Sequence, residues 1–317
     1  MSALLEIEDL AVSFGRTGAV RGTSFTVERG ETLSVVGESG CGKSVTALAV
    51  MNLLARGARR TARAMRFQGE DLMSLSDSGM ARLRGNDMAM IFQEPMTSLN
   101  PAYTVGSQMT EVLRRHKGTP QRLAIDRAAD LLARVGITAP GLRLGQFPHQ
   151  LSGGLRQRVM IAMALMCEPK LLIADEPTTA LDVTVQAQIL RLLAQLQRDL
   201  GLGMLLITHD LGIVARVAHK VAVMYAGKVV ENAATAELFA SPRHPYTQGL
   251  LRCVPVPGKI KRDEPLGSIP GTVPRVGPDF EGCAFRERCS FADATCTQDI
   301  PRHQAGTTHD FLCRLPS

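Results

Sequence analysis

An eight-residue string from Gly37 to Ser44, GESGCGKS, constrains the fold of this chain more than any other part of it. It follows a short apolar run, residues 32–37, that is typical of a buried strand, and it precedes a stretch from Lys43 to about Leu54 that is expected to be helical. The string fits G-x-x-x-x-G-K-[ST], a loop whose backbone N–H groups and following helix hold phosphate. Lys43 is expected to reach the terminal phosphates, and Ser44 to hold Mg²⁺. A dinucleotide fold is disfavoured because the glycines run G-x-x-G-x-G.

Short apolar runs elsewhere predict the framework around this loop. Further buried strands are expected at residues 88–92, 171–175, 204–209 and 221–225. A helix is expected from Asp182 to Leu200, where apolar residues recur at helical spacing. Strands that alternate with helices indicate an α/β fold, layered around a mainly parallel sheet.

Two regions depart from this alternation. Residues 100–165 are expected to form one helix after another, which predicts a helical subdomain inserted in the core. After about Leu238 the chain becomes rich in proline and glycine and ends in a cysteine-containing segment. This change predicts a separate C-terminal extension with little regular structure.

The composition excludes some classes of protein. A net charge of +6 would suit an anionic partner, but it does not choose among nucleotide, acidic lipid and nucleic acid. Tryptophan is absent and aromatic residues make up 4%, which argues against a stacking platform for single-stranded nucleic acid. No signal-peptide pattern and no apolar run long enough to span a bilayer are present in the sequence, so we expect the chain to stay in the cytoplasm.

An acidic pair is expected to complete the metal site. Asp175 ends the apolar run LLIAD, and Glu176 follows it directly. Asp175 would bind Mg²⁺ through water, and Glu176 would polarise the attacking water. The alternative is an acidic pair that only caps the next helix.

The string LSGGLRQR, residues 151–158, is the most specific in the chain. Together with the loop and the acidic pair it resembles the signature of ATP-binding-cassette (ABC) ATPases, over nearly all 317 residues. The resemblance implies a P-loop NTPase cassette with a RecA-like core. It places an ATPase domain at 1–237, with the helical subdomain at about 94–166, and the extension at 238–317.

The resemblance also implies roles for single residues. Phe14, 23 positions before Gly37, would stack on adenine. Gln93 would sense the γ-phosphate and the metal, His209 would hold the γ-phosphate, and residues 179–182 (TALD) would form the D-loop. The implied catalytic residues are Glu176, His209, Lys43 and Gln93, and the implied Mg²⁺ ligands are Ser44, Gln93 and Asp175. The implied nucleotide-binding residues are Phe14, Gly37, Glu38, Ser39, Gly40, Cys41, Gly42, Lys43, Ser44, Val45, Ser152, Gly153, Gly154 and Gln157.

The residue types of the signature string suit it to bind an anion. Ser152, Gly153 and Gly154 open a helix and offer a hydroxyl, bare N–H groups and a helix dipole to an anion. In the family this signature serves the ATP held by a second subunit, so that two cassettes enclose two nucleotides. Closure of the pair would surround the γ-phosphate with fixed donors and exclude water.

Two further strings narrow the resemblance. Residues 94–101 (EPMTSLNP) and 241–251 (SPRHPYTQGLL) resemble ATPase subunits of bacterial oligopeptide, dipeptide and nickel importers, of the D type. The implied function is ATP-driven peptide import at the cytoplasmic face of the cell membrane. The implied partners are an F-type ATPase chain, two permease subunits and, indirectly, an extracytoplasmic substrate-binding protein, with no nucleic acid. The alternatives are import of nickel or another small solute, and a soluble ABC ATPase outside transport.

Four cysteines lie near the end of the chain, at Cys283, Cys289, Cys296 and Cys313. Disulfides are not expected in a chain that works with cytosolic ATP. The spacing C-x5-C-x6-C-x16-C suits an iron–sulfur cluster, and the resemblance to the D-type subunit points to [4Fe–4S]. Zinc is one alternative, although C-x2-C pairs are missing, and free thiols are another.

Two other features raise smaller hypotheses. The Cys41 thiol, near a helix N-terminus, is expected to have a lowered pKa and unusual reactivity, unless it is only a small residue that fits. The segment 55–67 (ARGARRTARAMRF) holds five arginines. It is interpreted as a solvated loop, with contact to anionic lipid as the alternative.

Overall fold

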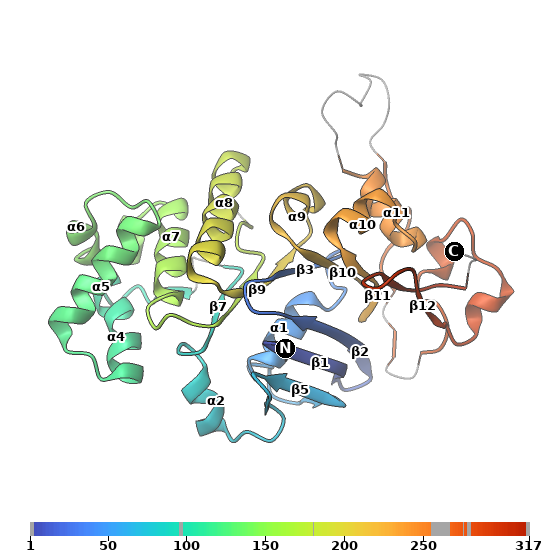
Figure 1. Cartoon of the computed structure of the whole chain (residues 1–317), viewed down its shortest axis with the longest axis horizontal. Coiled ribbons are helices and arrows are strands. Elements are labelled where there is room, and N and C mark those ends of the chain that lie inside the picture. The colour runs from blue at the N-terminus through green and yellow to red at the C-terminus, as the bar shows by residue number, and fades with distance from the viewer. Residues whose placement is uncertain are drawn as a thin grey trace. The chain divides into compact units, whose positions relative to one another are not determined.

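Two compact units make up the chain, whose computed structural model describes residues 3–94, 98–179, 181–254, 267–274, 276–277 and 280–314 (Figure 1). The first unit comprises Met1–Val27, Glu31–Met73 and Ile207–Ser317. The second comprises Glu28–Gly30 and Ser74–Leu206. The predicted site residues therefore fall into both units, and each unit has its own internal geometry.

An antiparallel sheet begins the first unit. Its strands are β1 (Leu5–Phe14), β2 (Thr17–Val27), β4 (Ala58–Thr61), β5 (Ala64–Phe67) and β6 (Glu70–Asp71). They follow the order β2-β1-β5-β6, and β4 also pairs with β1. Buried residues alternate with more exposed ones along β1, as expected of a sheet with one covered face.

The arginine-rich segment 55–67 belongs to this sheet, so its interpretation as a loop is wrong, although the side chains of Arg63 and Arg66 are exposed as expected. Most of it forms β4 and β5, both paired with β1. Arg63 forms ion pairs of 3.1 Å with both Glu8 and Asp9, and Arg66 forms one of 3.1 Å with Glu6. Carboxylates of β1 thus pair with two of the five arginines, a pairing that the segment's own composition does not reveal.

A second sheet of the first unit carries the phosphate loop. In the order β12-β13-β11-β10-β3 it contains β12 (Arg302–Gln304), β13 (Asp310–Leu312), β11 (Lys228–Ala234), β10 (Lys220–Tyr225) and β3 (Thr32–Val36). Strands β3 and β10 are parallel, whereas β11 is antiparallel to both β10 and β13. Every residue of β3 is buried, which explains its unbroken apolar run. The predicted strands at 32–37 and 221–225 are thus confirmed as β3 and β10.

Helices of the first unit are short. They are α1 (Lys43–Val50), α9 (Leu211–Val217), α10 (Thr235–Ala240) and α11 (Pro245–Arg252), with 3₁₀ turns η2 (Arg286–Arg288) and η3 (Ala294–Thr297). Helix α1 ends before the expected Leu54, because Met51 caps it and Asn52 takes a left-handed conformation with φ of 51°.

The C-terminal extension shares a hydrophobic core with the second sheet and is not separate from it. Tyr225 of β10, Tyr246 of α11 and Phe285 pack with ring centroids 4.6 to 5.4 Å apart. Val36 of β3 and Val276 belong to the same buried cluster. Because these aromatic residues are few and separated in sequence, no periodic pattern predicts that their rings pack together.

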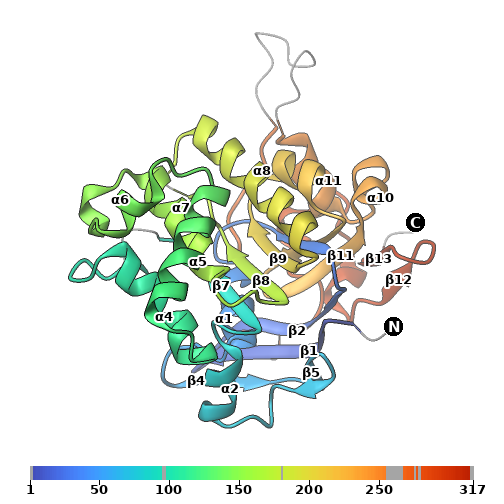
Figure 2. The same ribbon diagram turned by 60° about the vertical axis from the view of Figure 1, so that its left-hand side comes forward.

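Strands and long helices form the second unit. Its strands are β7 (Met88–Ile91) and β8 (Leu171–Asp175), which are parallel, followed in the sheet order by β9 (Gly203–Thr208), of which residues 203–206 belong to this unit. Its helices are α2 (Asp77–Leu83), α4 (Val105–Lys117), α5 (Gln121–Arg134), α6 (Pro140–Leu144), α7 (Gly153–Ala164) and α8 (Val183–Leu200), with the 3₁₀ turn η1 (Pro148–Gln150). Figure 2 shows α4, α5, α6 and α7 gathered in one group. The predicted strands at 88–92, 171–175 and 204–209 and the predicted helix at 182–200 are confirmed within a residue or so.

Among the described residues, no helix combines the length and the apolar character needed to cross a bilayer.

Candidate nucleotide-binding site

Two glycines set the path of the phosphate loop. A Cβ on Gly37 would lie 2.2 Å from the carbonyl oxygen of Met224, and one on Gly42 would lie 2.4 Å from that of Ala19. Gly42 also takes a left-handed conformation, with φ of 107°. The loop therefore runs against the backbones of β10 and β2 at points where only glycine fits.

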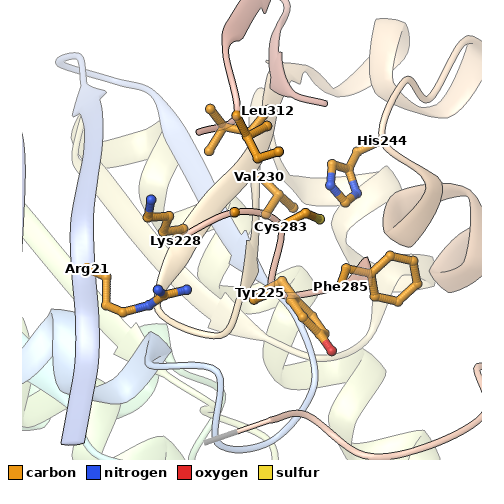
Figure 3. Close-up of a pocket in the computed structure, with 11 residues that line it drawn as sticks. Arg21, Tyr225, Lys228, Val230, His244, Cys283, Phe285 and Leu312 are labelled. Atoms are coloured by element: carbon orange, nitrogen blue, oxygen red, sulfur yellow. The ribbon is translucent and has the colours of Figure 1, made fainter. Parts of the chain in front are cut away.

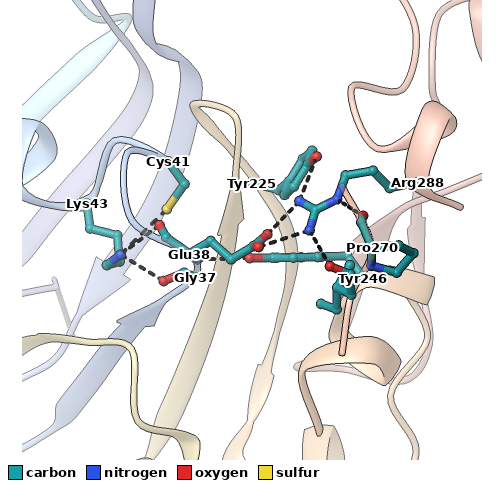
Figure 4. Close-up of polar contacts among 9 residues, drawn as sticks. Gly37, Glu38, Cys41, Lys43, Tyr225, Tyr246, Pro270 and Arg288 are labelled. Carbon is teal, nitrogen blue, oxygen red and sulfur yellow. Dashed lines mark hydrogen bonds and ion pairs between the residues drawn. The ribbon is translucent and has the colours of Figure 1, made fainter. Parts of the chain in front are cut away.

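The loop ends at the N-terminus of α1, with Lys43 folded back across it. Gly42 caps α1 without a side-chain hydrogen bond, so the first N–H groups and the helix dipole face the loop. Nζ of Lys43 donates to the carbonyl oxygens of Gly37 at 2.8 Å and Glu38 at 3.0 Å, as Figure 4 shows. A buried cation thus lies within the curl of the loop, as an anion-binding loop requires.

Cys41 belongs to the loop, but its side chain points into the protein and not toward the surface. Its side chain is fully buried, and Nζ of Lys43 lies 3.8 Å from its Sγ. Burial raises the pKa of Cys41, and the opposing effect of Lys43 does not offset it. The prediction of a lowered pKa is wrong, because desolvation of the thiolate outweighs the nearby positive charge. The structure supports the other interpretation, a small residue that fits.

Phe14 and His209 are the other predicted nucleotide contacts in the first unit. Phe14 ends β1 with 37% of its surface exposed, as a ring that stacks on a base requires. His209 is exposed and follows β9, immediately before Asp210, which caps α9 by accepting a hydrogen bond from the N–H of Ile213 at 3.2 Å. Their contact with nucleotide stays a prediction.

The second unit brings Gln93 and Glu176 together. Nε2 of Gln93 donates to Oε2 of Glu176 at 3.3 Å, and Oγ1 of Thr179 donates to the same oxygen at 2.9 Å. Glu176 has a φ of 43°, uncommon for a residue with a side chain. Asp175 ends β8 and is 4% exposed. A carboxylate held by two donors at a strand end is suited to orient a water molecule.

The signature string opens helix α7 as predicted. Oγ of Ser152 caps the helix by accepting from the N–H of Leu155 at 3.4 Å, and Ser152 and Gly153 are both exposed. Gln157 differs, because it is fully buried and neither of its amide atoms has a hydrogen-bond partner among the described residues. Nucleotide binding by Gln157 is thus untested and would need the helix face to open.

Two predicted strings are described only in part. In the D-loop string 179–182, Ala180 lies outside the described residues, and Asp182 caps α8 by accepting from the N–H of Val185 at 2.9 Å. In the string 94–101, residues 95–97 also lie outside them.

All four C-terminal cysteines line one small pocket, with Phe285 in its wall; they are Cys283, Cys289, Cys296 and Cys313. Cys283 also lines the pocket of Figure 3, together with Arg21 and Lys228. Burial raises the pKa of Cys283 to about 11, and the neighbouring thiols act in the same direction. In the described part of the chain no cysteine forms a disulfide, and no group of three or more His, Cys, Asp or Glu is arranged to hold a metal ion.

Sequence reasoning missed two residues that contact the loop. Tyr246 lies in the string 241–251, and Arg288 lies directly before Cys289. Both form hydrogen bonds with Glu38. Their residue types carry no signal for this contact, since the contact depends on how the extension folds over β10.

The fold and this loop define a P-loop nucleotide-binding protein. A family model described as "ABC transporter" matches residues 20–179, and one described as "Oligopeptide/dipeptide transporter, C-terminal region" matches residues 230–296. The oligopeptide transport ATP-binding protein OppD of Bacillus subtilis is 50% identical over 98% of this chain and 88% of its own length. The dipeptide transport ATP-binding protein DppD of Escherichia coli is 50% identical over 94% of this chain and 92% of its own.

Solved structures agree with this assignment. CbiO1 from Clostridium perfringens, described as part of the ABC transporter complex CbiONQ, matches with a TM-score of 0.67 and 29% identity over 76% of this chain and 92% of that chain. The chain therefore belongs to the ABC transporter family of ATP-binding proteins, in its oligopeptide and dipeptide branch. The predicted family and the P-loop cassette fold are confirmed, whereas the cysteine-containing extension in that prediction is not.

Proposed function

We propose that this chain is an ATP-hydrolysing subunit that powers peptide import across the cytoplasmic membrane, bound to the cytoplasmic face of the transporter. One observation carries the proposal. The chain is 50% identical to OppD and to DppD over 94% or more of its length, and the C-terminal transporter region is included. Import of nickel or another small solute by the same machinery is the alternative within this class.

The proposed chemistry is hydrolysis of MgATP at the phosphate loop. Nζ of Lys43 would exchange its bonds with the loop carbonyls for phosphate oxygens, and the N-terminus of α1 would face the same charge. Bound Mg²⁺ would neutralise phosphate charge, and its proposed ligands are Ser44, Gln93 and Asp175. Their residue types suit Mg²⁺, which prefers oxygen ligands.

Glu176 is proposed to orient and activate the attacking water, and His209 to hold the γ-phosphate. The hydrogen bonds that Gln93 and Thr179 donate to Glu176 support its role, because they hold the carboxylate in one orientation. The remaining nucleotide contacts predicted from the sequence, from Phe14 to Gln157, rest on the family resemblance.

The proposed assembly contains a second ATPase subunit and two permease subunits. Ser152 and Gly153 are exposed at the start of α7, as a surface that serves a partner's nucleotide requires. We favour a related F-type chain as the second ATPase and an extracytoplasmic binding protein as the source of cargo. The ATPase domain is proposed to span 1–237 and the extension 238–317.

We also propose that the four cysteines hold a [4Fe–4S] cluster that fixes the tail. Four thiols between residues 283 and 313 line one pocket, which supports the proposal, although in the described residues they are not arranged to hold a metal ion. Iron, sulfide and zinc should be measured in protein purified without oxygen, beside C289S and the control C253S, whose cysteine is not in that pocket. About four iron and four sulfide per chain, lost in C289S alone, would support the cluster. Zinc alone, or no metal, would reject it.

The catalytic assignment is tested by Glu176→Gln. The variant should keep ATP affinity, lose at least about 100-fold in turnover and accumulate as a nucleotide-bound dimer. Glu70→Gln, an exposed carboxylate of β6, is the matched control and should behave as the unmodified chain. Turnover within a few-fold of normal in E176Q would reject the role of Glu176.

The transport assignment needs a separate experiment. The chain should co-purify with integral-membrane proteins from detergent-solubilised membranes, and reconstituted vesicles should take up labelled peptide only with ATP. Uptake of nickel in place of peptide would support the alternative cargo. A chain that hydrolyses ATP but co-purifies with no membrane protein would support a soluble ABC ATPase.

A further inference from the structure

One arginine of the C-terminal extension, Arg288, forms hydrogen bonds with the phosphate loop. In Figure 4 the guanidinium of Arg288 faces the carboxylate of Glu38, the second residue of the loop. Nη1 donates to Oε2 at 2.8 Å and Nη2 donates to Oε1 at 3.0 Å. Two parallel bonds between ionised groups fix the direction as well as the distance between the two side chains.

Arg288 is itself held in place by the extension. Its Nε donates to the carbonyl oxygen of Pro270 at 2.7 Å, and Nη2 donates to that of Ile269 at 3.1 Å. Nη1 also donates to the hydroxyl of Tyr225 at 3.3 Å, and the guanidinium lies 5.9 Å from the ring centre of Phe285. The side chain is 5% exposed. Such a guanidinium cannot follow a moving partner, so it acts as a fixed support for Glu38.

Glu38 is held on two further sides. Its N–H donates to the hydroxyl of Tyr246 at 2.9 Å, and its carbonyl oxygen accepts from Nζ of Lys43. Tyr246 is fully buried in α11, within the aromatic cluster that joins the extension to β10. The backbone and side chain of one loop residue are therefore fixed by two different parts of the extension.

The charges strengthen this arrangement. The hydrogen bond to Glu38 raises the pKa of Arg288, so the cation persists at every working pH. Glu38 is 30% exposed at its side chain, so water does not fully screen the pair. Without Arg288, a carboxylate beside the phosphate site would be free to turn toward bound phosphate and repel it.

We propose that Arg288 is a positioning residue for the nucleotide site: it holds Glu38, and with Tyr246 it keeps the phosphate loop in the curl that receives MgATP. This proposal rests on the proposed function in one respect, that residues 37–44 bind the nucleotide. The C-terminal extension is thereby part of the ATP site's support, and the segment that ends at Cys289 sets the loop's conformation.

The test measures nucleotide affinity with a fluorescent ATP analogue and steady-state ATPase kinetics, on the protein in its full assembly. Arg288→Ala should raise Kd and KM about tenfold and leave kcat within about twofold, since the bonds to Glu38 support binding and do not touch the reacting atoms. Arg288→Lys, which keeps the charge but not the fork, should give an intermediate rise. Arg286→Ala is the matched control in the same 3₁₀ turn, because its guanidinium faces Phe280 and Glu281 and not the loop.

A double-mutant cycle separates positioning from general damage. Glu38→Gln should raise Kd to a similar extent, and the pair with R288A should be no worse than either alone, because both remove one contact. If R288A proves unstable in thermal melts without nucleotide, Tyr246→Phe serves in its place. It keeps the buried ring and removes only the hydroxyl, and we expect a threefold to fivefold rise of Kd, or roughly 1 kcal/mol.

Each outcome decides the matter. Normal affinity in R288A or Y246F, an equal loss in R286A, or independent effects of E38Q and R288A would overturn the proposal. If the unmodified chain binds no ATP, the proposed function fails instead, so the two failures are distinguishable.

Discussion

Replacing Glu231 by glutamine should weaken the folded protein far more than a surface substitution does. Glu231 is fully buried in β11 and accepts three hydrogen bonds. Its Oε1 accepts from the N–H of Arg243 at 2.7 Å and from Nε2 of His309 at 2.7 Å, and its Oε2 accepts from the N–H of His244 at 2.9 Å. The carboxylate thus joins β11 to the start of α11 and to the residue before β13.

The magnitude follows from these contacts. A glutamine whose carbonyl oxygen replaces Oε1 would turn its NH₂ group toward the N–H of His244, which leaves a buried donor without an acceptor at about 1–3 kcal/mol. The other two bonds would lose their ionised acceptor, at about 1 kcal/mol each. We therefore expect the free energy of unfolding to fall by roughly 3–5 kcal/mol.

Urea unfolding followed by far-ultraviolet circular dichroism measures this loss. Glu237→Gln is the control, because its carboxylate accepts one exposed bond from Thr308 and the change should stay within about 0.5 kcal/mol. A loss in E231Q no larger than that of E237Q would refute the reasoning, since it would mean that the buried contacts do not stabilise the fold.

Two further predictions concern His244 and Gly42. Burial lowers the pKa of His244 from 6.5 to about 4, so the folded state keeps the ring neutral while the unfolded chain protonates it. Stability should fall as pH drops from 6.5 to 4, by up to about 3 kcal/mol, and His244→Asn should flatten that slope in urea titrations because an amide oxygen can still cap the N–H of Tyr246. An unchanged slope would contradict this. Gly42→Ala should abolish ATP binding, because its Cβ would lie 2.4 Å from the carbonyl oxygen of Ala19, whereas Gly141→Ala, with open space around it, should bind normally. Binding by G42A at normal affinity would show that the loop has another path.

Local patterns predicted the elements of the fold well. A buried strand and an amphipathic helix each require apolar residues at a fixed spacing, so both can be predicted from the sequence. This applies to the apolar runs of β3, β7, β8, β9 and β10 and to the apolar stripe of α8. The phosphate loop was also predictable, since the close approach of Gly37 and Gly42 to other backbones admits only glycine at those positions.

Contacts between distant segments were not predictable in this way. Arg63 and Arg66, two of the five arginines of residues 55–67, pair with carboxylates of β1, and the lowered pKa expected for Cys41 is reversed by burial. The sequence of those segments does not predict which strand they pair with or which residues bury them. The same holds for the hydrogen bonds that Gln93 and Thr179 donate to Glu176.

By itself, the sequence determined that this protein carries a phosphate loop, a cassette signature and an α/β core, because each depends on residue types at fixed local spacing. Only the tertiary structure decided that Arg288 and Tyr246 of the C-terminal extension hold Glu38. Those contacts join Glu38 to residues 250 and 208 positions away in the sequence, and the packing of aromatic rings on β10, not a local pattern, determines which residues meet.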